Sequence, residues 1–121
     1  MTALIDQAAA LLDGGGAHAT TRACWLARAA LEDAVGDLLV AADLDVGDAS
    51  GTARLTCLQV AYEEHPDLAA RAEYAWSRLS EACHHHAFAL APTHGEAQHL
   101  VGLVRQFVAA AAAWHHAPTT H

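Results

Sequence analysis

Apolar residues recur every three or four positions along most of the 121-residue chain, and this spacing places them on one face of an α-helix. Stretches rich in Gly, Asp or Pro interrupt the pattern and mark its turns. The pattern predicts five helices, at about residues 3–12, 20–43, 52–64, 66–90 and 94–114. The tail, 115–121, is expected to fray.

Capping residues support these boundaries. Thr20 or Thr21 is expected to cap the second helix and Thr93 the fifth, because a hydroxyl oxygen accepts hydrogen bonds from the free N–H groups of a first helical turn. The glycines at 14–16 are expected to end the first helix, since glycine readily takes the left-handed conformation found at helix C-termini. Pro66 suits the first turn of the fourth helix.

The inner faces of these helices give a candidate core. Its larger members are Leu31, Val35, Leu38, Leu58, Leu68, Leu79, Leu103 and Phe107. Trp25 is expected to widen the apolar face of the second helix, whereas Arg28 and Glu32 lie off that face and are expected to contact water. We therefore predict an all-α fold, an antiparallel bundle of four or five helices that forms a single domain over residues 1–121.

Composition agrees with this fold class and narrows the cellular setting. The chain is 54% hydrophobic but only 6% aromatic, and its excess of Ala and Leu favours helices over strands. The apolar run 108–113 is too short to span a bilayer, so no membrane partner is expected. Without a signal-peptide pattern, and with three widely spaced Cys, we expect a cytoplasmic protein with buried free thiols.

The charge of the chain limits its partners. Six basic residues, all Arg, stand against fourteen acidic ones, which gives a formal net charge of −8. Such a chain is a poor general binder of nucleic-acid backbones, because nonspecific affinity comes from contacts between cations and phosphates. A small local Arg patch is the arrangement that still allows RNA binding.

Chemically active side chains are densest at residues 78–86, late in the fourth predicted helix. Arg78 and His85 are seven residues apart and share a helix face, and Glu81 lies one turn from each. On such a face Arg78 can hold a phosphate, His85 can transfer protons and Glu81 can orient the imidazole. The simpler alternative is a solvated helix face with charge pairs at helical spacing.

The layout resembles the HEPN family (higher eukaryotes and prokaryotes nucleotide-binding), small all-helical domains of prokaryotic defence and toxin–antitoxin systems. The similarity rests on residues 23–32 as an early long helix, and on residues 79–93 followed by a final helix. The RNases of that family carry an Arg and then a His; here five residues separate Arg78 from His84, and six separate it from His85. The resemblance implies a metal-independent endoribonuclease, or an RNA- or nucleotide-binding component, without a cofactor. It also implies a homodimer, with a cognate antitoxin or another protein as partner.

The chain departs from that family pattern in two respects. The Arg of the family is often nearer the His, at a place held here by residues 81–83. The apolar Leu79 follows Arg78, where the family usually has a polar residue. The alternative is therefore a family member that does not cleave RNA, or a non-catalytic dimeric interaction module. The small Ala faces of the helices would allow close packing between subunits in such a module.

A metal site is a further alternative. Glu81 with His84, and Glu96 with His99, form Glu-x-x-His patterns on either side of the turn at Pro92. Two such patterns on facing helices, with a Glu from each of two other helices, form the di-metal site of ferritin-like bundles. Candidate donors of those carboxylates are Glu32, Glu63 and Glu64. Because Glu32 lies away from the apolar face of its helix, we expect no bound metal.

Overall fold

The computed structural model describes residues 4–15, 18–44, 47, 50–83 and 92–116. Its helices are α1 (Leu4–Gly14), α2 (Ala19–Ala41), α3 (Gly51–Ala61), α4 (Pro66–Cys83) and α5 (His94–His116). No strand occurs within the described ranges, so the predicted all-α helical bundle is confirmed. None of these helices, as far as they are described, is long and apolar enough to cross a membrane.

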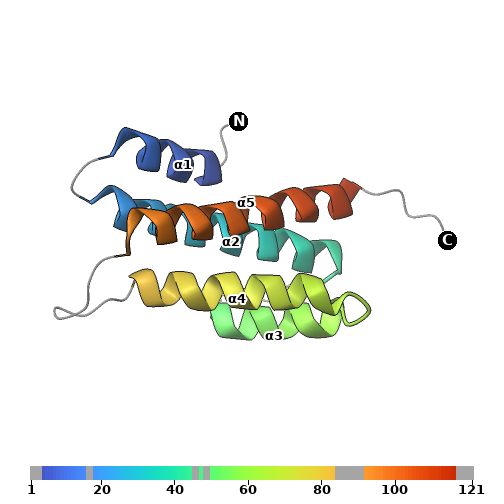
Figure 1. Ribbon diagram of the computed structural model, residues 1–121. Coiled ribbons are helices and arrows are strands. Elements are labelled where there is room, and N and C mark those ends of the chain that lie inside the picture. Colours follow the sequence, from blue (N-terminus) through green and yellow to red (C-terminus); the bar gives the residue numbers. More distant parts are fainter. Residues whose placement is uncertain (1–3, 16–17, 45–46, 48–49, 84–91, 117–121) are drawn as a thin grey trace.

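The longest helices, α2 and α5, form the centre of the bundle (Figure 1). α1 packs on α2 and α5, and α4 packs on the same two helices from the other side. α3 lies outermost and contacts α2 and α4. Gly51 lies near Glu32, and the Tyr62 hydroxyl donates to the Leu38 carbonyl at 2.7 Å, so α3 runs in the same direction as α2.

The candidate core is confirmed for most of its members. Six of the eight predicted residues are at most 3% exposed: Leu31, Val35, Leu38, Leu58, Leu79 and Phe107. Leu68 and Leu103 are only partly buried and pack against the edge of this core. Alanines on α2 and α4 are also buried, and their small side chains let these two helices approach closely.

Helix ends follow the capping prediction at α5 but not at α2. The Glu96 backbone N–H donates to Thr93 Oγ1 at 3.1 Å, and the Thr93 N–H donates to Glu96 Oε1 at 3.2 Å. This reciprocal pair is a capping box. The predicted Thr cap of α2 is wrong, because the helix already begins at Ala19 with His18 before it. Ala19 is buried, and its packing lets the helix begin one residue before Thr20.

Two large apolar side chains, Trp25 and Val60, are exposed, and Trp25 was predicted to widen the apolar face of α2. Trp25 is 49% exposed, which corrects its placement, and Val60 is 67% exposed. On α2 the buried positions around Trp25 are the smaller Ala23, Cys24 and Ala27, which turn that helix so that Trp25 lies at its flank. On α3 only Leu55 and Leu58 are buried among its described residues.

Candidate functional site

Arg78 lies in the last two turns of α4, with its side chain 45% exposed. The next residue, Leu79, is fully buried. The apolar residue after Arg78 is therefore part of the core, and its side chain points away from the surface that carries the guanidinium. The predicted core position of Leu79 is confirmed, and Arg78 lies at the surface beside it.

Two carboxylates hold the Arg78 guanidinium. Arg78 Nη1 lies 3.9 Å from Glu81 Oε2, three residues later on the same helix. Arg78 Nη2 lies 3.7 Å from Glu96 Oε2, in the first turn of α5. All three side chains are substantially exposed, and ion pairs of this kind stabilise a fold by only about 0–1 kcal/mol. The guanidinium is therefore oriented at the surface, but a competing anion can displace either partner.

Glu96 has a second role, because it belongs to the capping box with Thr93. Its carboxylate is thus fixed between the N-terminus of α5 and the guanidinium of Arg78. The Glu-x-x-His pattern suggests a metal ligand at Glu96 and gives no sign of this contact with Arg78 on another helix. The Thr-x-x-Glu spacing signals the capping role of Glu96, since it marks a carboxylate that turns back to the start of its own helix.

The structure brings Arg78 and Glu81 together as predicted, but it does not test the proton-transfer group. His84 and His85, the two candidates, lie outside the described residues. Their role, and the orienting role of Glu81 toward them, stay predictions. His99 is exposed on α5.

Three carboxylates of the metal alternative, Glu32, Glu81 and Glu96, have other partners. Glu96 is bound by its cap and by Arg78, and Glu32 contacts Arg28 and Trp76. Glu63 and Glu64 are exposed where the chain leaves α3. Among the described residues, no group of three or more His, Cys, Asp or Glu side chains could hold a metal ion.

A second polar cluster lies between α2 and α4, formed by Arg28, Glu32 and Trp76. Arg28 Nε is 3.5 Å from Glu32 Oε2, and the guanidinium carbon lies 5.4 Å from the Trp76 ring centroid. The indole N–H of Trp76 donates to Glu32 Oε2 at 3.3 Å. Arg28 is less exposed than predicted: only 19% of its side chain is accessible, because the Trp76 ring covers part of it.

Two buried thiols lie beside this cluster. Burial raises the pKa of Cys24 to about 11, and the nearby Cys83 and Glu96 add to the effect. Burial also raises the pKa of Cys83, although the guanidinium of Arg28 opposes that rise. Both thiols are free, as predicted, and stay protonated near neutral pH, so neither is suited to nucleophilic catalysis. The third cysteine, Cys57, is free and partly buried.

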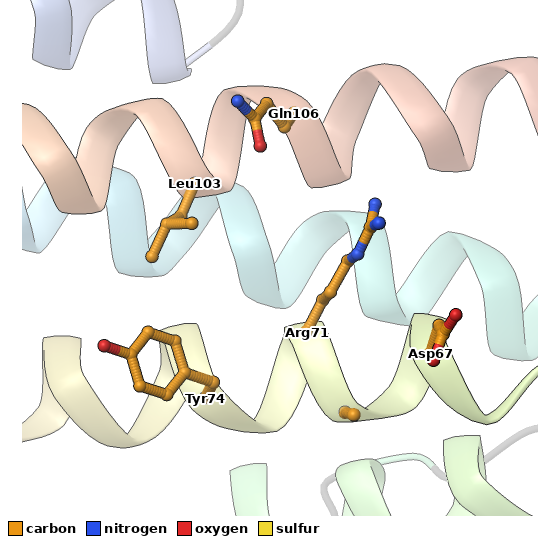
Figure 2. A pocket seen from close by; sticks show the side chains of 6 residues that line it. Asp67, Arg71, Tyr74, Leu103 and Gln106 are labelled. Atoms are coloured by element: carbon orange, nitrogen blue, oxygen red, sulfur yellow. The ribbon is translucent and has the colours of Figure 1, made fainter.

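An open groove of about 490 Å³ lies between α4 and α5. Its lining residues are Asp67, Ala70, Arg71, Tyr74, Leu103 and Gln106. Figure 2 shows Arg71 reaching from α4 toward α5, and Leu103 reaching from α5 toward α4. Arg71 and Tyr74 stand about two turns and one turn before Arg78 on α4. Helical spacing does not reveal the groove, because α5 supplies the opposite wall.

Comparisons with protein-family models, with curated proteins and with solved structures find no match to this chain.

Proposed function

We propose that this chain is a HEPN-like helical domain that binds RNA through Arg78 and cleaves it without a metal ion. The observation that carries the proposal is the placement of Arg78, a half-exposed guanidinium held at the surface by two carboxylates. A guanidinium binds phosphate oxygens in a bidentate manner. Glu81 and Glu96 keep it extended toward solvent until a phosphate takes their place.

The carboxylates also set the expected strength of binding. A phosphate must compete with Glu81 and Glu96 for the same guanidinium, and the chain carries a formal net charge of −8. RNA affinity is therefore expected to be modest and to fall steeply with salt, because each phosphate contact releases counterions.

In the proposed reaction, each group has a separate task. Arg78 holds the scissile phosphate and stabilises the charge that develops on its oxygens. His85, or alternatively His84, removes the proton of the attacking ribose 2′-hydroxyl as its oxygen bonds to phosphorus, and a proton returns to the 5′ oxygen as the P–O5′ bond breaks. Glu81 orients that imidazole. None of these tasks requires a metal ion, so cleavage is expected to continue in the presence of EDTA.

Arg78→Gln tests the proposal, with Arg105→Gln as the matched control. Arg105 is exposed like Arg78, and it pairs with a carboxylate, Asp6 Oδ1 at 3.4 Å. This pair joins α5 to α1. Arg78→Gln is expected to abolish EDTA-resistant cleavage of single-stranded RNA, with unchanged circular dichroism. Arg105→Gln is expected to leave cleavage intact. Equal activity in the two variants would refute the assignment.

Glu81→Gln separates the two roles of that carboxylate. If Glu81 only competes with phosphate, the variant binds RNA more tightly and cleaves at least as fast. If Glu81 also orients the imidazole, the variant binds more tightly but cleaves more slowly, because the correct ring orientation is less populated. The proposal predicts the second result.

A homodimer and a cognate antitoxin belong to the same proposal, as the HEPN resemblance implies. The exposed Trp25 and Val60 also favour a second candidate function, a non-catalytic interaction module, because such side chains are suited to protein contacts. Light scattering tests the dimer. A monomer at micromolar concentration would count against the dimer and against a site shared between subunits.

A further inference from the structure

We infer that the groove between α4 and α5 is a binding site for single-stranded RNA, in which a base stacks on Tyr74 and a phosphate binds Arg71. This inference rests on the proposed function and extends it. It names the residues, other than Arg78, that bind the single strand. The groove has an open volume of about 490 Å³, which gives room for a nucleotide-sized group.

Arg71 supplies the cation of this site. Arg28, Arg78 and Arg105 each have a carboxylate within 4.0 Å. Within the described ranges, by contrast, the guanidinium of Arg71 has no ion-pair or hydrogen-bond partner. A guanidinium in a groove with no carboxylate within 4.0 Å attracts an anion more strongly than one already held by two carboxylates.

Tyr74 supplies the stacking surface. Its side chain is 52% exposed, although it is aromatic and lines the groove. Figure 2 shows its ring on the α4 side of the groove, one turn from Arg71 along the same helix. Proteins that bind single strands combine a cationic groove with aromatic rings on which bases stack. A double helix would not offer a free base face to this ring.

The remaining walls fit the same occupant. Leu103 from α5 gives an apolar surface opposite Tyr74, and the amide of Gln106 can donate to and accept from the edge of a base. Asp67 lies one turn before Arg71 and repels phosphate, so the strand is expected to leave the groove toward Arg78. The site therefore has a direction along α4.

Arg71, Tyr74 and Arg78 follow one another at intervals of three and four residues on α4. Residues at this spacing lie on one face, and seven residues of α-helix rise by about 10.5 Å. The two guanidiniums thus stand at the ends of a short track with an aromatic ring between them. A single strand whose phosphates alternate with stacked bases matches this order of groups.

The test uses the full chain and an end-labelled oligoadenylate with 2′-O-methyl riboses, which resists cleavage, in fluorescence anisotropy at low salt. Tyr74→Ala is expected to weaken binding by about 5- to 150-fold, the range that base–aromatic stacking supplies. Tyr74→Phe is expected to retain binding. Arg71→Gln is expected to remove about one phosphate contact, so that log Kd depends less steeply on the logarithm of the salt concentration. Asp67→Asn is expected to strengthen binding.

The outcomes separate the two claims. If the wild-type chain binds and Arg78→Gln weakens it, while Tyr74→Ala and Arg71→Gln bind like wild type, the groove inference is overturned and the proposed function stands. That result would leave the groove to a different class of partner, such as a protein. If the wild-type chain binds no RNA at low salt, both claims fall. Circular dichroism of each variant shows that the fold is retained.

Discussion

Replacing Gly51 with Ala is expected to destabilise the protein, although most Gly→Ala changes in helices do the opposite. Gly51 is the first residue of α3 and faces the indole of Trp76. A Cβ at this position would lie 2.5, 2.7 and 2.8 Å from three atoms of that ring, Cζ2, Cε2 and Nε1. Carbon atoms in contact are normally about 3.5–4.0 Å apart, so the ring must move by roughly 1 Å.

The indole of Trp76 is not free to move that far. The Arg28 guanidinium covers one face at 5.4 Å from the centroid, and the indole N–H donates to Glu32 at 3.3 Å. Overpacking of this kind costs about 1–3 kcal/mol. The better helix propensity of Ala offsets about 0.5–1 kcal/mol of that cost. The free energy of unfolding is therefore expected to fall, by up to about 2.5 kcal/mol, or up to roughly 10 °C in Tm.

Gly102→Ala is the matched control. Gly102 lies inside α5, and a Cβ added there meets nothing within 4 Å. This variant is expected to gain about 0.5–1 kcal/mol of stability from helix propensity alone. Urea unfolding followed by far-UV circular dichroism measures both variants under the same conditions.

A double variant checks the cause. Trp76→Phe removes part of the indole, so Gly51→Ala is expected to cost much less in that background, with a coupling energy of about 1 kcal/mol or more. The reasoning fails if Gly51→Ala is as stable as Gly102→Ala, or if Trp76→Phe leaves its cost unchanged.

Three further predictions concern pH, capping and metal. Because the folded pKa of Cys24, about 11, exceeds its ordinary value of 9.0, unfolding releases a proton between those values. The free energy of unfolding is therefore expected to fall by about 2–3 kcal/mol as pH rises through that window. Urea titrations at each pH measure this free energy, and it should change less with pH in Cys24→Ala. Thr93→Ala is expected to cost about 1 kcal/mol through the lost capping box, and an unchanged Tm would contradict this. Elemental analysis is expected to find no stoichiometric iron, manganese or zinc; about two metals per chain, lost on changing His84 and His99, would support the ferritin-like alternative.

Local sequence was sufficient for the helices and for part of the site. The apolar repeat identified the inner faces, and Thr93 marked the start of α5, because both signals act within a few residues of the chain. Arg78 and Glu81 could be assigned to one solvent-facing stripe of α4, since helical periodicity fixes the angle between side chains on the same helix.

Tertiary structure decided which side chains the neighbouring helices cover. Arg28 lies at the flank of α2 and would contact water on an isolated helix, but α4 places Trp76 over it. Trp25 has the opposite outcome: it was expected to widen the apolar face of α2, and it is 49% exposed. Periodicity gives a direction around a helix axis, whereas burial at a flank depends on where the next helix packs.

The same limit applies to the candidate site. The contact between Arg78 and Glu96 joins the end of α4 to the start of α5, and the groove at Arg71 and Tyr74 needs Leu103 on its other wall. These pairs are far apart in sequence and meet only because α4 and α5 pack side by side. The sequence alone determined the stripe of α4 that faces solvent, and only the packing of α5 beside it decided which residues share that surface.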